Sequence, residues 1–138
     1  RYRGFSEEES ELTVVNNVQF YENFNILDFI RDVGINFRMS TMLGKESVSS
    51  RLNSPEGMTF TEFTYQIFQG YDFLRLRQDY NCIMQLGGSD QWGNITSGCD
   101  LIRKATGEEA YGVTIPLLTT AAGEKFGKSA GNALWLEK

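Results

Sequence analysis

Residues 82–102 read CIMQLGGSDQWGNITSGCDLI, and this stretch decides the fold. Its first five residues, 82–86, are mostly apolar and have the length of a buried strand, which Gly87 and Gly88 follow directly. Beyond the glycines, apolar residues recur at the spacing of a helix, at Trp92, Ile95, Cys99 and Ile102, and Gly107 is a candidate C-terminal cap.

A second apolar segment over 113–118 predicts another buried strand, and Pro116 places that strand at a sheet edge or a bulge. Two strands joined by a helix with long connections are typical of a parallel sheet. The sequence therefore predicts an α/β fold.

Residues before this unit are expected to be helical. Asn25 is a candidate N-cap for a short amphipathic helix over 26–33 that Gly34 ends. Its apolar stripe contains Ile26, Leu27, Phe29, Ile30 and Val33. A second helix is expected from about residue 40 to residue 52, followed by a turn over 53–57 that contains a proline and a glycine.

Thr59 and Glu62 have the spacing of a capping box, in which each side chain satisfies a backbone N–H of the helix start. The helix that they open is expected to reach about residue 78. Its apolar residues recur every three or four positions and predict one buried stripe: Phe60, Phe63, Ile67, Tyr71 and Leu74.

Composition restricts the possible chemistry. A chain of 138 residues with 41% hydrophobic content suits one globular domain. It contains no histidine, which excludes Ser-His-Asp and Cys-His catalysis and histidine-ligated zinc. Cys82 and Cys99 are too far apart for a redox or zinc motif and are expected to be reduced thiols. The net charge of −5 argues against non-specific coating of nucleic acid, and no apolar run is long enough to span a membrane.

One face of the helix opened by Thr59 carries polar groups suited to a small ligand. Tyr65, Gln69 and Asp72 lie at i, i+4 and i+7, so a phenol, an amide and a carboxylate point in similar directions, away from the apolar stripe. These groups can hold an ammonium and a hydroxyl through directed hydrogen bonds. The alternative is an ordinary solvent-exposed face.

The junction between strand and helix, residues 85–91 (QLGGSDQ), is a second candidate. Its glycines allow a ligand to approach the backbone, and the helix start offers unpaired N–H groups at the positive end of a dipole. Asp90 is suited to a ribose hydroxyl and Gln91 to a carbonyl or phosphate oxygen. The alternative is that Ser89 or Asp90 only caps the helix.

A third candidate is the loop over 125–129 (KFGKS), which we call the lysine loop. Lys125 and Lys128 are separated by a glycine, and further glycines flank the loop. Phosphoryl and nucleotidyl transfer depend on charge neutralisation and positioning, which two ammonium groups can supply. A solvated surface loop is again the alternative.

Taken together, residues 63–73 (FTYQIFQGYDF), 85–95 (QLGGSDQWGNI) and the lysine loop resemble the catalytic domain of the tyrosyl-tRNA synthetases. These are class I aminoacyl-tRNA synthetases, and the resemblance runs from about residue 16 to residue 138. The lysine loop matches the KMSKS motif of the family. Residues 54–58 and 127–133 look most like the mitochondrial branch, which implies the mitochondrial matrix, with the bacterial cytoplasm as the alternative.

The resemblance implies a Rossmann-like parallel sheet with a helical insertion, in which residues 1–138 form part of one catalytic domain. Residues 16–81 would be the helical insertion and the tyrosine-pocket helix, and 82–138 the second half of the nucleotide-binding fold. The implied reaction joins tyrosine and ATP, with Mg²⁺ on the ATP phosphates, into tyrosyl-adenylate and then esterifies tRNA(Tyr). A homodimer with Phe60 at its interface is also implied.

The same resemblance implies roles for single residues. Asp72 would take the phenolic hydroxyl of tyrosine, and Tyr65 and Gln69 its α-ammonium group. Gln85 would line the tyrosine pocket, and Asn17 would lie at its rim.

For the nucleotide, Gly88 and Asp90 would contact the ribose, and Leu117 and Leu118 would lie near adenine. Three residues would act in catalysis. Gln91 would meet the substrate carboxylate and the α-phosphate, and the lysines of the lysine loop, Lys125 and Lys128, would stabilise the α-phosphate and the departing pyrophosphate.

One family motif has no counterpart in this sequence. The HIGH motif holds two histidines that act on the phosphates, and the chain contains none. An upstream strand and an anticodon-binding region are also missing. We therefore expect a catalytic-domain fragment that is inactive or nearly so in isolation. Alternatives are a nucleotide- or RNA-binding pseudo-enzyme, a tryptophanyl-tRNA synthetase and an α/β domain without a ligand.

Overall fold

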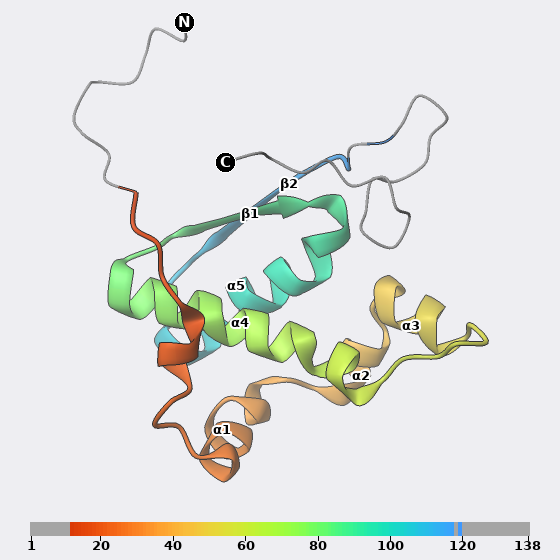
Figure 1. The fold of residues 1–138 in the computed structure, drawn as a ribbon, viewed down its shortest axis with the longest axis horizontal. Helices are drawn as coiled ribbons and strands as arrows, with labels where there is room; N and C mark the ends of the chain where they lie inside the picture. The colour runs from red at the N-terminus through yellow and green to blue at the C-terminus, as the bar shows by residue number, and fades with distance from the viewer. Residues whose placement is uncertain (1–11, 118, 120–138) are drawn as a thin grey trace, which may run out of the picture.

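The computed structural model describes residues 12–117 and Thr119, and most of this part is helical (Figure 1). The α-helices are α1 (Ile26–Asp32), α2 (Met39–Leu43), α3 (Glu46–Leu52), α4 (Phe60–Tyr80) and α5 (Trp92–Thr106). The strands are β1 (Met84–Gly88) and β2 (Tyr111–Ile115). Three short 3₁₀ helices complete the described elements: η1 (Asn17–Phe20), η2 (Gly34–Asn36) and η3 (Ser89–Gln91).

The two strands pair in parallel, with α5 as the connection between them, which confirms the predicted parallel α/β unit. The strand positions, however, differ from the prediction of 82–86 and 113–118. Pairing runs from Met84 opposite Tyr111 to Gly88 opposite Ile115, so the glycines lie inside β1 and not after it. The second strand ends before Pro116, which has no N–H to give to a ladder.

The strands are also less buried than predicted. Residues alternate along β1 and β2, and only one face of the ladder lies against α5. The other face exposes apolar side chains, namely Met84, Leu86, Tyr111, Val113 and Ile115. A run of apolar residues does not distinguish a strand covered on both faces from one covered on a single face.

The core lies where α4 crosses α5, and Figure 1 shows α5 between the strands and α4. Phe73 of α4 and Leu101 and Ile102 of α5 are fully buried there. The helices approach closely at two glycines: a Cβ placed on Gly70 would lie 3.5 Å from the Cα of Gly98. The N-terminal segment adds Phe20, Phe29 and Val33 to the same apolar cluster.

The predicted capping box opens α4. The Thr59 side chain accepts a hydrogen bond from the Glu62 N–H, and the Glu62 carboxylate accepts one from the Thr59 N–H. The helix ends at Tyr80, two residues beyond the prediction, and Asn81 follows in the left-handed conformation with φ 54°. Tyr71 and Leu74 of the predicted apolar stripe are buried, whereas Phe60 at the start of the helix is exposed.

The shorter helices correct two further predictions. Asn25 caps α1 and the helix ends just before Gly34, as predicted, but Ile26, Leu27 and Ile30 of the predicted apolar stripe are exposed. The helix predicted over 40–52 is two helices. Gly44 and an extended Lys45 separate α2 from α3, and the Lys45 side chain bonds to the Gly93 carbonyl of α5.

Candidate functional site

The α4 helix brings the predicted polar residues to one face and against two other segments. Tyr65 is 61% exposed, whereas Gln69 and Asp72 are half-buried. Their surroundings differ: Asp72 faces the N-terminal segment and Gln69 faces the start of α5.

The carboxylate of Asp72 receives two side-chain hydrogen bonds. Asn17 Nδ2 donates to its Oδ2 at 2.9 Å, and the Tyr21 hydroxyl donates to its Oδ1 at 2.6 Å. The predicted neighbour Asn17 is therefore beside Asp72. Tyr21 was not predicted, because it lies 51 residues away in the sequence and no spacing pattern links the two.

Burial and the nearby Asp72 carboxylate raise the pKa of the Tyr21 hydroxyl far above its usual 10. The phenol is therefore protonated at neutral pH and can donate. Its ring is enclosed by three others, with centroids 6.2 Å from Phe29, 5.8 Å from Phe68 and 5.4 Å from Tyr71.

An amide bridge joins α4 to the junction after β1. Asn94 Nδ2 donates to Gln69 Oε1 at 3.1 Å and to Gln91 Oε1 at 3.3 Å. With both carbonyl oxygens engaged, the NH₂ groups of the two glutamines are left as donors. Asn94 was not among the predicted site residues, although its position three residues after Gln91 places the two side chains close together at a helix start.

Gly88 lies close to two neighbouring side chains where β1 ends. A Cβ on Gly88 would lie 2.7 Å from Asp90 Oδ1 and 2.7 Å from Leu117 Cδ2, closer than real Cβ atoms approach. Three of the predicted ATP contacts, Gly88, Asp90 and Leu117, are thus adjacent. In the same strand, the buried Oε1 of Gln85 receives no hydrogen bond from the part of the chain that the structure describes.

A cavity of about 420 Å³ lies between these elements. Tyr65 and Gln66 of α4 line it on one side, and Asp90, Gln91 and Asn94 line it on the other. Gln66 is 3% exposed, and its Oε1 has no hydrogen-bond partner among the described residues. The structure therefore brings Tyr65 and the 85–91 junction to one cavity, and the Asn94 bridge connects Gln69 of α4 to that junction. Asp72 does not line this cavity and instead faces the N-terminal segment.

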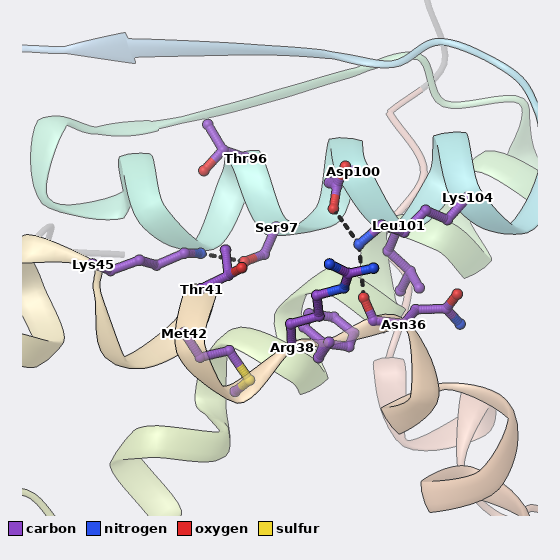
Figure 2. A pocket seen from close by; sticks show the side chains of 11 residues that line it. Asn36, Arg38, Thr41, Met42, Lys45, Thr96, Ser97, Asp100, Leu101 and Lys104 are labelled. Atoms are coloured by element: carbon purple, nitrogen blue, oxygen red, sulfur yellow. Dashed lines mark hydrogen bonds and ion pairs between the residues drawn. The ribbon is translucent and has the colours of Figure 1, made fainter.

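Lys45 lines both this cavity and a neighbouring one of about 330 Å³, and Figure 2 shows the residues around the second. Its ammonium donates to the Gly93 carbonyl at 2.5 Å and to the Ser97 hydroxyl. Burial lowers the pKa of Lys45. Across the second cavity, Lys104 contacts Asp100 at 2.6 Å and the Asn36 carbonyl at 2.8 Å, so α5 is tied to the segment before α2.

The other predicted site residues divide into two groups. Phe60 is 80% exposed at the start of α4 and lines an apolar groove of about 650 Å³ together with Phe63, Ile67 and residues of α1, α2 and α3. Lys125, Lys128 and Leu118 lie outside the described residues. Within 12–117 and at 119, the structure contains no cluster of three or more Cys, Asp or Glu side chains that could hold a metal ion, and no helix long and apolar enough to cross a membrane.

Comparison with known proteins assigns the family. A family model described as tRNA synthetases class I (W and Y) matches residues 2–138. The chain belongs to this family of class I synthetases. Its small parallel sheet and helices agree with a partial Rossmann-like core of such a synthetase domain.

Relatives of this class I synthetase chain are named as tyrosine–tRNA ligases. The chain is 56% identical over 132 residues to a Tyrosine--tRNA ligase of Protochlamydia amoebophila, covering 96% of this chain and 31% of the relative. It is 51% identical over 140 residues to Tyrosine--tRNA ligase 1 of Bacillus subtilis, covering all of this chain and 33% of the relative. The chain thus spans about a third of the length of these relatives.

A solved structure supports the same relationship. The class I chain matches a C-terminally truncated mitochondrial tyrosyl-tRNA synthetase of Coccidioides posadasii with a TM-score of 0.69 and 41% sequence identity. The match covers 80% of this chain and 34% of the other. The similar structures are mitochondrial, whereas the two sequence relatives named above are bacterial.

Proposed function

We propose that this chain is part of the catalytic domain of a tyrosine–tRNA ligase, which activates tyrosine with ATP and transfers it to tRNA(Tyr). The observation that carries the proposal is the amide bridge from Gln69 through Asn94 to Gln91. Activation requires the tyrosine carboxylate to meet the ATP α-phosphate. The bridge ties the helix proposed to hold the amino acid to the junction proposed to hold the nucleotide.

Asp72 is proposed to select tyrosine. A carboxylate accepts hydrogen bonds and cannot donate them, so its recognition of the substrate requires a hydroxyl. Phenylalanine lacks that hydroxyl, so its binding would bury the Asp72 carboxylate without a hydrogen-bond donor from the substrate. Tyrosine-activating synthetases are the standard example of this kind of discrimination. The exposed hydroxyl of Tyr65 and the second lone pair of the Gln69 carbonyl, whose first lone pair takes the Asn94 hydrogen bond, would accept from the α-ammonium group, and Gln85 and Asn17 would complete the pocket.

The chemistry is proposed to rest on positioning and charge neutralisation. A tyrosine carboxylate oxygen attacks the α-phosphorus, and the bond to the pyrophosphate oxygen breaks. The free NH₂ of Gln91 would orient the attacking carboxylate and the α-phosphate, while Gly88, Asp90 and Leu117 would border ribose and adenine. Lys125, Lys128 and Leu118 keep the roles that the resemblance implies, and Mg²⁺ would arrive on the ATP phosphates as part of the substrate.

The apolar groove around Phe60 is proposed to be covered by a second copy of the protein. Phe60 is mostly exposed, and apolar residues of α1 and α4 continue the groove around it. Exposed apolar area of this kind is typical of protein interfaces. We also propose the mitochondrial matrix as the compartment, with the bacterial cytoplasm as the alternative, because the similar structures are mitochondrial and the sequence relatives named above are bacterial.

Tyrosine-dependent exchange of pyrophosphate into ATP by the full-length protein that carries this chain tests the proposal. Asp72→Asn is expected to raise the KM for tyrosine and lower kcat/KM, and the KM for ATP should stay close to the original value. Asp79→Asn is the matched control, because Asp79 is on the same helix and, within the described part of the chain, pairs with Arg75 at the surface and not with the site. Exchange that depends on tryptophan would contradict the proposed specificity.

A second measurement addresses the missing HIGH motif. The 138-residue chain alone is expected to show little or no exchange, because it lacks the histidines that act on the phosphates. Turnover by the isolated chain near that of a complete enzyme would contradict this part of the proposal. A full-length protein without exchange activity would instead favour the pseudo-enzyme.

A further inference from the structure

We propose that Tyr21 is a positioning residue that determines specificity for tyrosine: its hydroxyl holds the Asp72 carboxylate in the orientation that accepts the substrate hydroxyl. The inference rests on the proposed function of Asp72 and names a further residue of the same site. Tyr21 would not touch the substrate itself and would act through Asp72.

The Tyr21 hydroxyl makes the shorter of the two contacts to Asp72. It lies 2.6 Å from Asp72 Oδ1 and 3.1 Å from the Phe68 carbonyl, and its one proton is best placed toward the carboxylate. Asn17 holds the opposite oxygen at 2.9 Å. Two donors from one short segment therefore bond to the two oxygens of the Asp72 carboxylate. Together these hydrogen bonds fix the plane of the carboxylate.

That segment is itself anchored to α4. Phe20, between the two donors, is 6% exposed and belongs to the core, and the guanidinium of Arg75 lies 5.7 Å from the centre of its ring. Asn16 caps η1 by accepting from the Val18 N–H. Because Phe20 is buried, the position of η1 on α4 is set by packing and not by the hydrogen bonds to Asp72.

The phenol of Tyr21 is a fixed donor and not a mobile placeholder for the substrate. Its ring lies among Phe29, Phe68 and Tyr71, with the Tyr71 centroid at 5.4 Å. Swinging the hydroxyl away from Asp72 would break these ring contacts. The side chain is therefore suited to remain in place while the substrate binds.

The carboxylate keeps capacity for a substrate hydroxyl. Its two oxygens offer about four lone-pair positions, and the internal donors use one on each oxygen. A substrate hydroxyl can take a third position without displacing Tyr21 or Asn17. Without Tyr21, the carboxylate would turn about its side-chain torsion, and the same hydroxyl would meet it in a range of orientations.

The test compares Tyr21→Phe with Tyr80→Phe in the full-length protein. Each change removes one phenolic hydroxyl that joins the N-terminal segment to α4 by a hydrogen bond. The Tyr80 hydroxyl of α4 accepts its bond from Gln19 Nε2 at 3.2 Å. Of these two hydroxyls, that of Tyr21 bonds to Asp72 and that of Tyr80 bonds to Gln19. A hydrogen bond to a charged group contributes more free energy than one between neutral groups. We therefore expect Tyr21→Phe to lower kcat/KM for tyrosine by about tenfold to a hundredfold.

Three readouts separate positioning from loss of folding. The KM for ATP and the thermal midpoint should stay near those of Tyr80→Phe, and the preference for tyrosine over phenylalanine should fall by about the same factor as kcat/KM for tyrosine. If Tyr21→Phe does not fold, Asn17→Ala, which removes the other donor from an exposed position, should reduce the same preference. Equal preferences in Tyr21→Phe and Tyr80→Phe would overturn the inference.

Two other outcomes are also decisive. A lower KM for tyrosine in Tyr21→Phe would overturn the inference by showing that the phenol competes with the substrate. Absence of tyrosine-dependent exchange in the unmodified full-length protein would instead refute the proposed function.

Discussion

The crossing of α4 and α5 predicts opposite outcomes for the same substitution at two facing glycines. A Cβ on Gly98 would lie 2.9 Å from Cδ1 and 3.2 Å from Cβ of Phe73, which is 1% exposed and has no room to move. A Cβ on Gly70 would meet the outer ring carbon of Phe37 at 3.4 Å and Gly98 Cα at 3.5 Å, which are ordinary contacts.

Both positions are helical, so alanine gains about 1 kcal/mol of helix propensity at each. At Gly98 this gain is opposed by overpacking, which typically costs about 1–3 kcal/mol. We expect Gly98→Ala to lower the free energy of unfolding by about 1 kcal/mol and Gly70→Ala to leave it unchanged or raise it by up to about 1 kcal/mol. The difference between the variants isolates the steric cost, since the propensity gain is common to both.

Urea unfolding of the two variants and the unmodified protein, followed by circular dichroism, measures this difference. The midpoints should shift in opposite directions, or only that of Gly98→Ala should fall, while the slope with denaturant stays constant. Equal midpoints for the two variants would refute the reasoning, because the close approach of Gly98 to Phe73 would then carry no energetic cost.

Two further predictions follow from the capping box and the sheet. The Thr59 N–H and hydroxyl and the Arg51 guanidinium lower the pKa of Glu62 from 4.5 to about 2. The ionised carboxylate thus stabilises the fold above about pH 4.5, and this contribution is lost as the pH falls toward 2. The stability difference between the unmodified protein and Glu62→Gln should therefore shrink over that range in pH-dependent unfolding, and a constant difference would contradict the assignment. Gly112→Ala would place a Cβ 2.3 Å from Cγ2 of Ile95, which is fully buried, so the thermal midpoint should fall by several degrees, and an unchanged midpoint would count against this packing.

Local signals in the sequence were sufficient for several helix boundaries. The capping box at Thr59 and the cap at Asn25 involve residues two or three positions apart, and Gly107 closes α5 with a φ of 75° that favours glycine. Each of these features depends on the backbone within one turn. They were predicted correctly because no distant residue decides them.

Features that depend on distant residues were mispredicted or missed. The break between α2 and α3 was not predicted, and Lys45 at this break bonds to the Gly93 carbonyl, 48 residues away. The strand limits follow the pairing of β1 with β2, which a single apolar run does not reveal. Tyr21 was missed for the same reason, because its contact with Asp72 spans 51 residues and the fold alone brings them together.

The α4 helix also restricts which length changes the gene can tolerate. Successive helical residues turn by about 100°, so one residue inserted between Gln69 and Asp72 would rotate the carboxylate by more than a quarter of a turn away from Asn17. The turn before α4, residues 53–58, carries no such phase relationship and can lengthen or shorten at its surface. We therefore expect insertions and deletions among natural variants to be found in that turn and to be absent from the helical segment between Tyr65 and Asp72.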